Sequence, residues 1–109
     1  MGKPVSDVRA ASTRAYRWGT GAVVAISGTS TDAAAFSDLG TVGDNEVMLE
    51  ATVECYVAIG TSAIAAASSS SPLHLSAGER WHLRLEPDDT HYRAIAVSTS
   101  GSLRLVAAV

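Results

Sequence analysis

The clearest pattern along the chain is a strict alternation of apolar and polar positions over residues 46–60. One face of this segment carries Val47, Leu49, Ala51, Val53, Cys55, Val57 and Ile59, and the other carries Met48, Glu50, Thr52, Glu54, Tyr56 and Ala58. A period of two predicts a half-buried β-strand, or two strands in a bent continuation. A helix would scatter the apolar residues around its circumference.

Shorter segments of the same kind surround this one. Trp81, Leu83 and Leu85 alternate with charged residues and a histidine over residues 80–86. We also expect strands at residues 21–28 and 73–76, with a turn at Ala77-Gly78. Residues 91–98 and 102–109 are predicted to form a terminal hairpin, in which Gly101 supplies the positive φ of the turn. Residues 33–39 fit either a helical turn or a short strand.

These elements predict an all-β fold, a small antiparallel β-sandwich or jelly-roll-like barrel with an extended N-terminal arm. A chain of 109 residues is long enough for one domain. We assign residues 19–109 to the sandwich and residues 1–18 to the arm, because residues 1–15 show no periodicity. Much of the apolar content is alanine and only 6% of residues are aromatic. The core is therefore expected to be thin, and association would stabilise it.

Charge is distributed unevenly along the chain. The net charge is −3, yet the first 17 residues carry four basic residues against one aspartate. The acidic balance argues against a nucleic-acid partner, which requires a dense basic face. Arginine and tryptophan are enriched where interfaces concentrate their binding energy. We therefore predict that the arm binds a protein partner through Lys3, Arg9, Arg14, Arg17 and Trp18; alternatively, it is a solvated basic tail with Trp18 in the core.

Other compositional signals exclude several classes. The single cysteine, Cys55, excludes an internal disulfide framework. No apolar run approaches the ~18 residues of a membrane helix, and no signal-peptide pattern follows Lys3. We expect no membrane association and no cofactor.

The sequence evidence for catalytic and metal-binding groups is weak. Ser62 lacks the second glycine and the following helix of a nucleophile elbow. Cys55 alternates with Val53 and Val57, so we expect a buried, unreactive thiol. His74 and His82 are expected to face solvent, and the spacing of His74, His82 and His91 does not specify a metal site. Asp88 and Asp89 fit a turn between strands better than a calcium loop. We therefore predict no catalytic, cofactor-binding or metal-binding residues.

A resemblance adds to this interpretation. From Leu49 to Val109 the chain carries a strand ending in V-A-I-G (residues 57–60), a small-residue loop, an L-x-A-G turn (75–78), an aromatic-led strand and a terminal A-V-x-x-x-G-x-L segment (96–103). This order resembles small virion proteins of tailed bacteriophages, including capsid decoration (cement) proteins. It covers about the last 60 residues.

The resemblance implies a non-enzymatic virion structural protein. Such a protein would bind the outer capsid lattice through the major capsid protein and stabilise the head, as a homotrimer on the capsid exterior after synthesis in the host bacterial cytoplasm. The alternative is a carbohydrate- or receptor-binding module of a phage head or tail appendage, with Tyr56, Trp81 and Tyr92 as candidate exposed rings. A third class, a small β-barrel enzyme, would need a metal at the three histidines.

Overall fold

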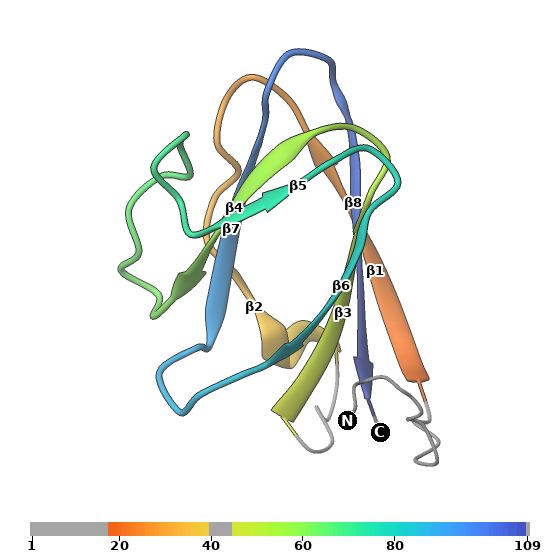
Figure 1. Ribbon diagram of the computed structural model, residues 1–109. Helices are drawn as coiled ribbons and strands as arrows, with labels where there is room; N and C mark the ends of the chain where they lie inside the picture. Colours follow the sequence, from red (N-terminus) through yellow and green to blue (C-terminus); the bar gives the residue numbers. More distant parts are fainter. Residues whose placement is uncertain (1–17, 40–44, 109) are drawn as a thin grey trace, which may run out of the picture.

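The computed structural model describes residues 18–39 and 45–108, which form eight strands and one short 3-10 helix (Figure 1). In chain order these elements are β1 (Trp18–Ile26), β2 (Ala34–Ala35), η1 (Phe36–Leu39), β3 (Glu46–Ala51), β4 (Cys55–Gly60), β5 (Leu73–Leu75), β6 (Arg80–Arg84), β7 (His91–Ala96) and β8 (Gly101–Ala108). No helix of the described residues is long and apolar enough to cross a membrane.

The strands form two four-stranded antiparallel sheets, with the orders β1-β8-β3-β6 and β2-β7-β4-β5. In these orders the strands pair first with last: β1 with β8, β2 with β7, β3 with β6, and β4 with β5. This nested pairing is the jelly-roll arrangement, in which a long antiparallel ribbon is wrapped into two facing sheets. The prediction of an all-β fold, either a small antiparallel β-sandwich or a jelly-roll-like barrel, is confirmed as a sandwich.

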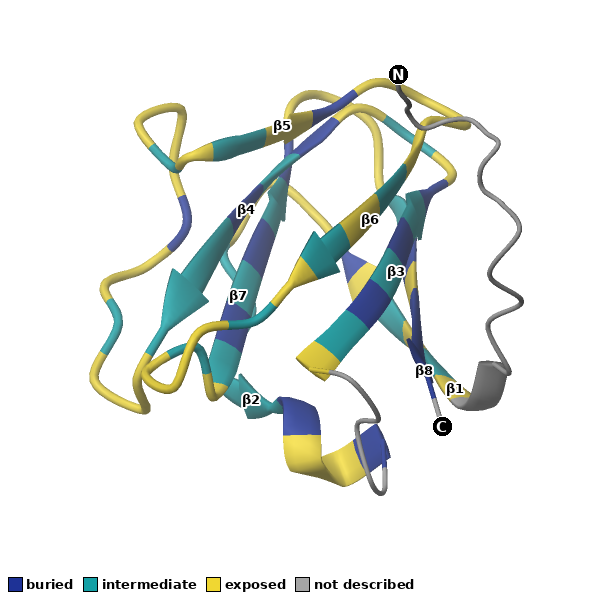
Figure 2. Ribbon diagram, turned by 60° about the horizontal axis from the view of Figure 1, so that its bottom comes forward, coloured by how far each residue is buried: buried dark blue, intermediate teal, exposed yellow. Residues whose placement is uncertain are grey.

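The alternating segment 46–60 forms two strands, and they belong to different sheets. β3 lies in the first sheet and β4 in the second, with a short corner at residues 52–54 between them. Val47, Leu49, Cys55 and Val57 all have no exposed surface. The alternation continues through the corner because both inner faces point into the same core (Figure 2).

The core between the sheets is built mainly from aliphatic side chains, with Phe36 and Tyr92 as buried aromatic members. Its buried members include Leu49, Leu75, Leu103 and Leu105 with four alanines, at positions 51, 94, 96 and 107. Among the described residues no polar or charged side chain is buried. The alanines bring the sheets together but bury little apolar area, which agrees with the predicted thin core.

The predicted terminal hairpin is wrong. Its strands exist as β7 and β8, but β7 pairs with β2 and β4 while β8 pairs with β1 and β3. The chain crosses from one sheet to the other at residues 97–100. Gly101 does not have a positive φ; among the described glycines only Gly78 does, at 79°. A Cβ at Gly101 would lie 2.6 Å from Oγ1 of Thr52, so close approach of the β3–β4 corner favours glycine there.

Other local expectations have mixed outcomes. Residues 34–39 contain both alternatives, a two-residue strand followed by the 3-10 helix. The positive φ of Gly78 confirms the turn before β6. The turn at residues 86–89 is closed by the Asp89 N–H, which donates to the Glu86 carbonyl over 2.8 Å. The Glu86 N–H donates to the Asp89 carboxylate in return, also over 2.8 Å.

The predicted arm lies almost entirely outside the described residues. Lys3, Arg9, Arg14 and Arg17 belong to the segment that is not described, and β1 begins at Trp18. The division into an arm and a sandwich domain therefore stays a prediction. Trp18, the first residue of β1, is in register with Ala108, near the end of β8.

Candidate partner-binding face

The outer face of the sheet β1-β8-β3-β6 brings together residues that are distant in the sequence. The strand registers place Val23 beside Arg104, Arg104 beside Glu50, and Glu50 beside Arg80. These side chains form a row across all four strands. We call this outer surface the arginine face; it comprises Gly21, Val23, Glu46, Met48, Glu50, Arg80, His82, Arg84, Arg104 and Val106.

The arginine face differs in charge from the remainder of the domain. It holds three of the four arginines of the described residues, together with two glutamates. The other acidic residues that the structure describes are Asp32, Asp38, Glu54, Glu79, Glu86, Asp88 and Asp89, which lie in loops, turns and the 3-10 helix. The face is therefore slightly positive on a domain that is acidic elsewhere.

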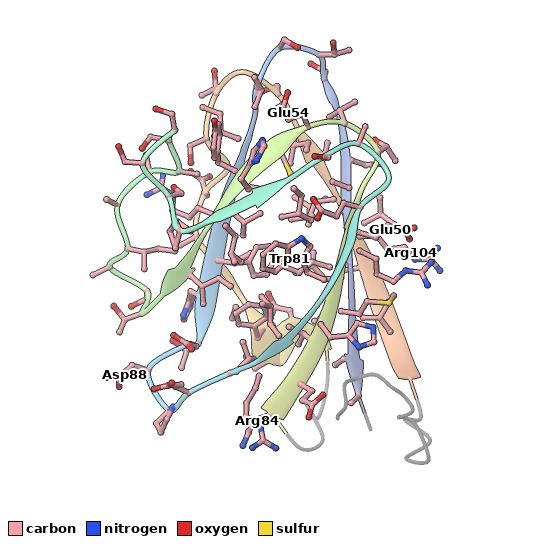
Figure 3. All side chains as sticks on the ribbon, viewed as in Figure 1. Glu50, Glu54, Trp81, Arg84, Asp88 and Arg104 are labelled. Carbon is pink, nitrogen blue, oxygen red and sulfur yellow. The ribbon has the colours of Figure 1, made fainter. Side chains whose placement is uncertain are left out.

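The ion pairs leave one arginine of this face unpaired. Arg80 lies 3.3 Å from the Glu50 carboxylate, and Arg84 lies 3.8 Å from that of Glu46. Arg104 is exposed and has no ion-pair partner among the residues that the structure describes. Figure 3 shows Arg104 and Glu50 on the same side of the sandwich. Exposed ion pairs contribute only about 0–1 kcal/mol to stability, so the exposed guanidinium groups of Arg80 and Arg84 can still contact a partner.

Apolar groups are interleaved with the charges. Val23 is 70% exposed, the highest value among the large hydrophobic residues that the structure describes as exposed. It lies in register with Arg104, and the next row places Met48 beside Val106. A surface with arginines, a methionine and an exposed valine has the composition of a protein-binding interface.

The predicted arm directly precedes this sheet in the sequence. β1 is an edge strand of the sheet that carries the arginine face, and it begins at Trp18, the residue that follows 1–17. No sequence signal marks the face itself, because its residues come from four strands whose order the sequence does not reveal.

The opposite sheet is partly covered by the long loop between β4 and β5, residues 61–72. Arg93 of β7 holds this loop: its guanidinium donates to the carbonyl oxygens of Thr31, over 2.8 Å, and Ile64, over 3.1 Å. The Ala67 N–H also donates to Oγ of Ser30 over 2.9 Å. Arg93 is therefore a structural residue, a role that no pattern in the sequence indicates.

Ser62 and Cys55 have no catalytic surroundings. Ser62 is exposed in the 61–72 loop, with no described helix after it. Cys55 is fully buried in β4, as predicted, and burial raises the pKa of its thiol to about 11, with a smaller contribution from the charge of Glu54. The thiol is therefore protonated at neutral pH and shielded from solvent, so it is a core residue.

A small polar cluster lies on the outer face of the second sheet. Nε2 of His74 lies 2.6 Å from the Glu54 carboxylate, and the His74 ring stacks on Tyr56 with centroids 4.9 Å apart. His74 and Glu54 are each about half exposed, at 46% and 47%. His74 thus faces outward, as predicted.

The three aromatic rings proposed for carbohydrate recognition do not share a face. Tyr56 lies on the outer face of the second sheet, whereas Trp81 packs against the core from β6, between the two sheets (Figure 3). Tyr92 is only 3% exposed and packs on Phe36 with ring centroids 5.0 Å apart. The expectation that Tyr92 is exposed is wrong, because its side chain points to the inner face of β7.

The histidines do not converge either. His74 lies on β5 of the second sheet, while His82 faces outward from β6 of the first, and His91 begins β7. Within residues 18–39 and 45–108, no group of three or more histidine, cysteine or acidic side chains is arranged to hold a metal ion.

A hollow of about 550 Å³ lies between η1 and the β6–β7 turn and is lined in part by Phe36, Leu85, Pro87 and His91. It is wide open to solvent. Its polar groups already serve the turn: Asp89 accepts the Glu86 N–H, and Nδ1 of His91 lies 2.8 Å from Oγ1 of Thr90. This hollow is therefore a weaker candidate site than the arginine face.

No known protein family, curated protein or solved structure matches the chain. The fold and its surfaces define the class as a small all-β jelly-roll sandwich.

Proposed function

We propose that this chain is a non-enzymatic virion structural protein of a tailed bacteriophage, which binds the outer capsid lattice and stabilises the head as a decoration protein. The observation that carries the proposal is the arginine face, where Arg104, without an ion-pair partner among the described residues, lies beside exposed Val23 on an otherwise acidic domain. The resemblance of residues 49–109 to small phage virion proteins supports it. The partner would be the major capsid protein.

The order of elements along the chain also supports this proposal. In the sequence, the predicted basic arm directly precedes β1, an edge strand of the sheet that carries the arginine face. Two binding elements attached to one sheet would engage the same lattice surface together. Linked contacts of modest strength give durable attachment, because the second contact forms at high effective concentration. Jelly rolls occur in viral capsid domains but also in lectins and enzymes. The proposal therefore rests on the residues of the surface and not on the fold.

The experiment is co-sedimentation of the purified chain with heads of the phage that encodes it, after removal of the native copy. The variant carries Arg80→Ala and Arg104→Ala. Its matched control carries Ala66→Glu and Ser69→Glu, which change the net charge equally on the exposed 61–72 loop of the opposite sheet. We expect the arginine variant to lose most of its binding and the control to bind as the parent does.

A second variant tests the arm separately. Deletion of residues 1–17 is expected to leave a folded domain that no longer attaches durably to the head. Equal binding by the parent, the arginine variant and the deletion would refute the proposal.

The carbohydrate-binding alternative has weaker support. Aromatic rings that bind a sugar act together from one face, and Tyr56, Trp81 and Tyr92 are separated by the sandwich. Only Tyr56, beside His74, presents a ring on an outer sheet surface. Binding to a glycan array that Tyr56→Ala abolishes would favour this alternative over attachment to the capsid.

A further inference from the structure

The four edge strands of the two sheets differ in how they discourage pairing with another chain. An edge strand exposes unpaired backbone N–H and C=O groups, and natural edges are protected by short length, charges, proline or bulges. β2 has two residues and β5 has three, while β6 carries Arg80, His82 and Arg84. Each of these three edges has a recognisable protection.

β1 lacks this protection along most of its length. It has nine residues, WGTGAVVAI, with neither a charge nor a proline. Its pairing with β8 is irregular only between Trp18 and Gly21, and from Gly21 to Ile26 the register is continuous. Within the described residues no strand pairs with the other edge of β1, which borders its sheet in Figure 1. A long, neutral and regular edge favours addition of a further strand.

We propose that β1 of one copy pairs antiparallel with β1 of a second copy, with Val23 at the two-fold axis, so that the sheets β1-β8-β3-β6 of the two copies join. This register places Gly21 opposite Ala25, Ala22 opposite Val24 and Val23 opposite Val23 of the partner copy. Small residues face small residues on the outer face, and the largest exposed side chain meets its own copy at the centre. An isologous contact requires this kind of self-complementary surface.

The distribution of charge favours β1 over β6 as the pairing edge, and it allows a second copy to bind there. Self-pairing through β6 would bring Arg80, His82 and Arg84 beside the same residues of the other copy, and like charges directly opposite are destabilising. Through β1, the nearest charges on the arginine face are the two Arg104 side chains. They would be separated by three strand spacings, about 14 Å. That distance exceeds the screening length of about 8 Å at physiological ionic strength, so their repulsion would be weak.

Burial also favours the second copy. Val23 is 70% exposed at the centre of the strand, and Ala22 and Val24 are only partly buried at the border of the core. The pairing would cover all three and extend the core across the junction. Because the interior is thin and rich in alanine, this additional apolar burial would contribute a larger share of the stability than it would in a larger domain. The inference concerns association of this chain with itself and does not depend on attachment to a capsid.

The first test is the mass of the full-length chain in solution, measured by sedimentation velocity over a range of micromolar concentrations. We expect a reversible species of twice the 11.2 kDa chain mass. Val23→Lys should weaken dimerisation by roughly tenfold or more, because it places two ammonium groups at the axis. The control is Val97→Lys, since Val97 is 44% exposed but lies outside the strands. It should dimerise as the parent does.

The second test determines where the two copies contact each other. Val23→Cys should form a disulfide-linked dimer under mild oxidation, because Cβ atoms of directly opposed residues are about 4.5–5.5 Å apart. Native Cys55 is fully buried and should not compete. Val97→Cys is the control and should cross-link far more slowly. Equal cross-linking of the two variants would overturn the proposal.

Other occupants of the edge would give different results. A parent chain that stays monomeric at all concentrations overturns the proposal, whatever the effect of Val23→Lys on head binding, because Val23 also belongs to the arginine face. A trimer in which Val23→Cys does not cross-link would also overturn it.

Discussion

The buried thiol of Cys55 predicts a specific alkaline weakening of the fold. Its pKa is raised from the ordinary 9.0 to about 11, first by burial and then by the charge of Glu54. In the unfolded chain the thiol ionises near its ordinary pKa, so the unfolded state loses its proton first as the pH rises. The stabilisation is therefore fully present below about pH 8 and is lost progressively as the pH rises towards 11.

The loss in the free energy of unfolding can be calculated from the pKa shift of Cys55. Each pKa unit corresponds to about 1.36 kcal/mol, so the complete transition is worth about 2.7 kcal/mol. At pH 10.5, between the two pKa values, linkage gives a loss of about 1.9 kcal/mol relative to pH 8. This is a large fraction of the ~5–15 kcal/mol that stabilises an ordinary domain.

The assay is urea denaturation of the parent and of Cys55→Ala at pH 8 and at pH 10.5, under reducing conditions. The variant loses the titrating group but keeps Tyr92, whose pKa burial also raises, so the comparison isolates Cys55. The free energy of unfolding of the parent should fall by about 2 kcal/mol more than that of the variant. Parallel losses in the two proteins would refute a buried, protonated thiol in the core.

Two further predictions concern residues that hold corners and loops. Gly101→Ala should destabilise the fold by about 1–3 kcal/mol in thermal or urea unfolding, because its Cβ would crowd Oγ1 of Thr52, whereas Gly28→Ala meets nothing within 4 Å and should be neutral. Equal effects of the two substitutions would contradict the proposed close approach. Arg93→Ala should release the 61–72 loop, seen as faster limited proteolysis there, at a cost of about 1–3 kcal/mol. Unchanged cleavage would show that the guanidinium does not hold the loop.

The alternation of the sequence predicted the buried faces but not the partners of the strands. Val47, Leu49, Cys55 and Val57 were placed inward correctly, because a period of two reports only which side of a strand meets the core. It carries no information on which of two facing sheets a strand joins. The segment 91–109 was therefore assigned to a hairpin, although β7 and β8 belong to different sheets.

The candidate site could not be predicted from the sequence for the same reason. Glu50, Arg80 and Arg104 are neighbours only because β3 pairs with both β6 and β8. The charges of the arm were visible because they are contiguous in the chain. Their proposed partner surface required the strand order, and so did the contrast between the neutral edge of β1 and the charged edge of β6.

The most direct test of the central claim is a cryo-electron microscopy reconstruction of the phage particle that encodes this chain. We expect the jelly roll on the outer surface of the head, with the arginine face and residues 1–17 directed at the major capsid protein. Absence of the chain from the head surface, or an orientation in which Arg104 and Val23 point away from the capsid protein, would contradict it.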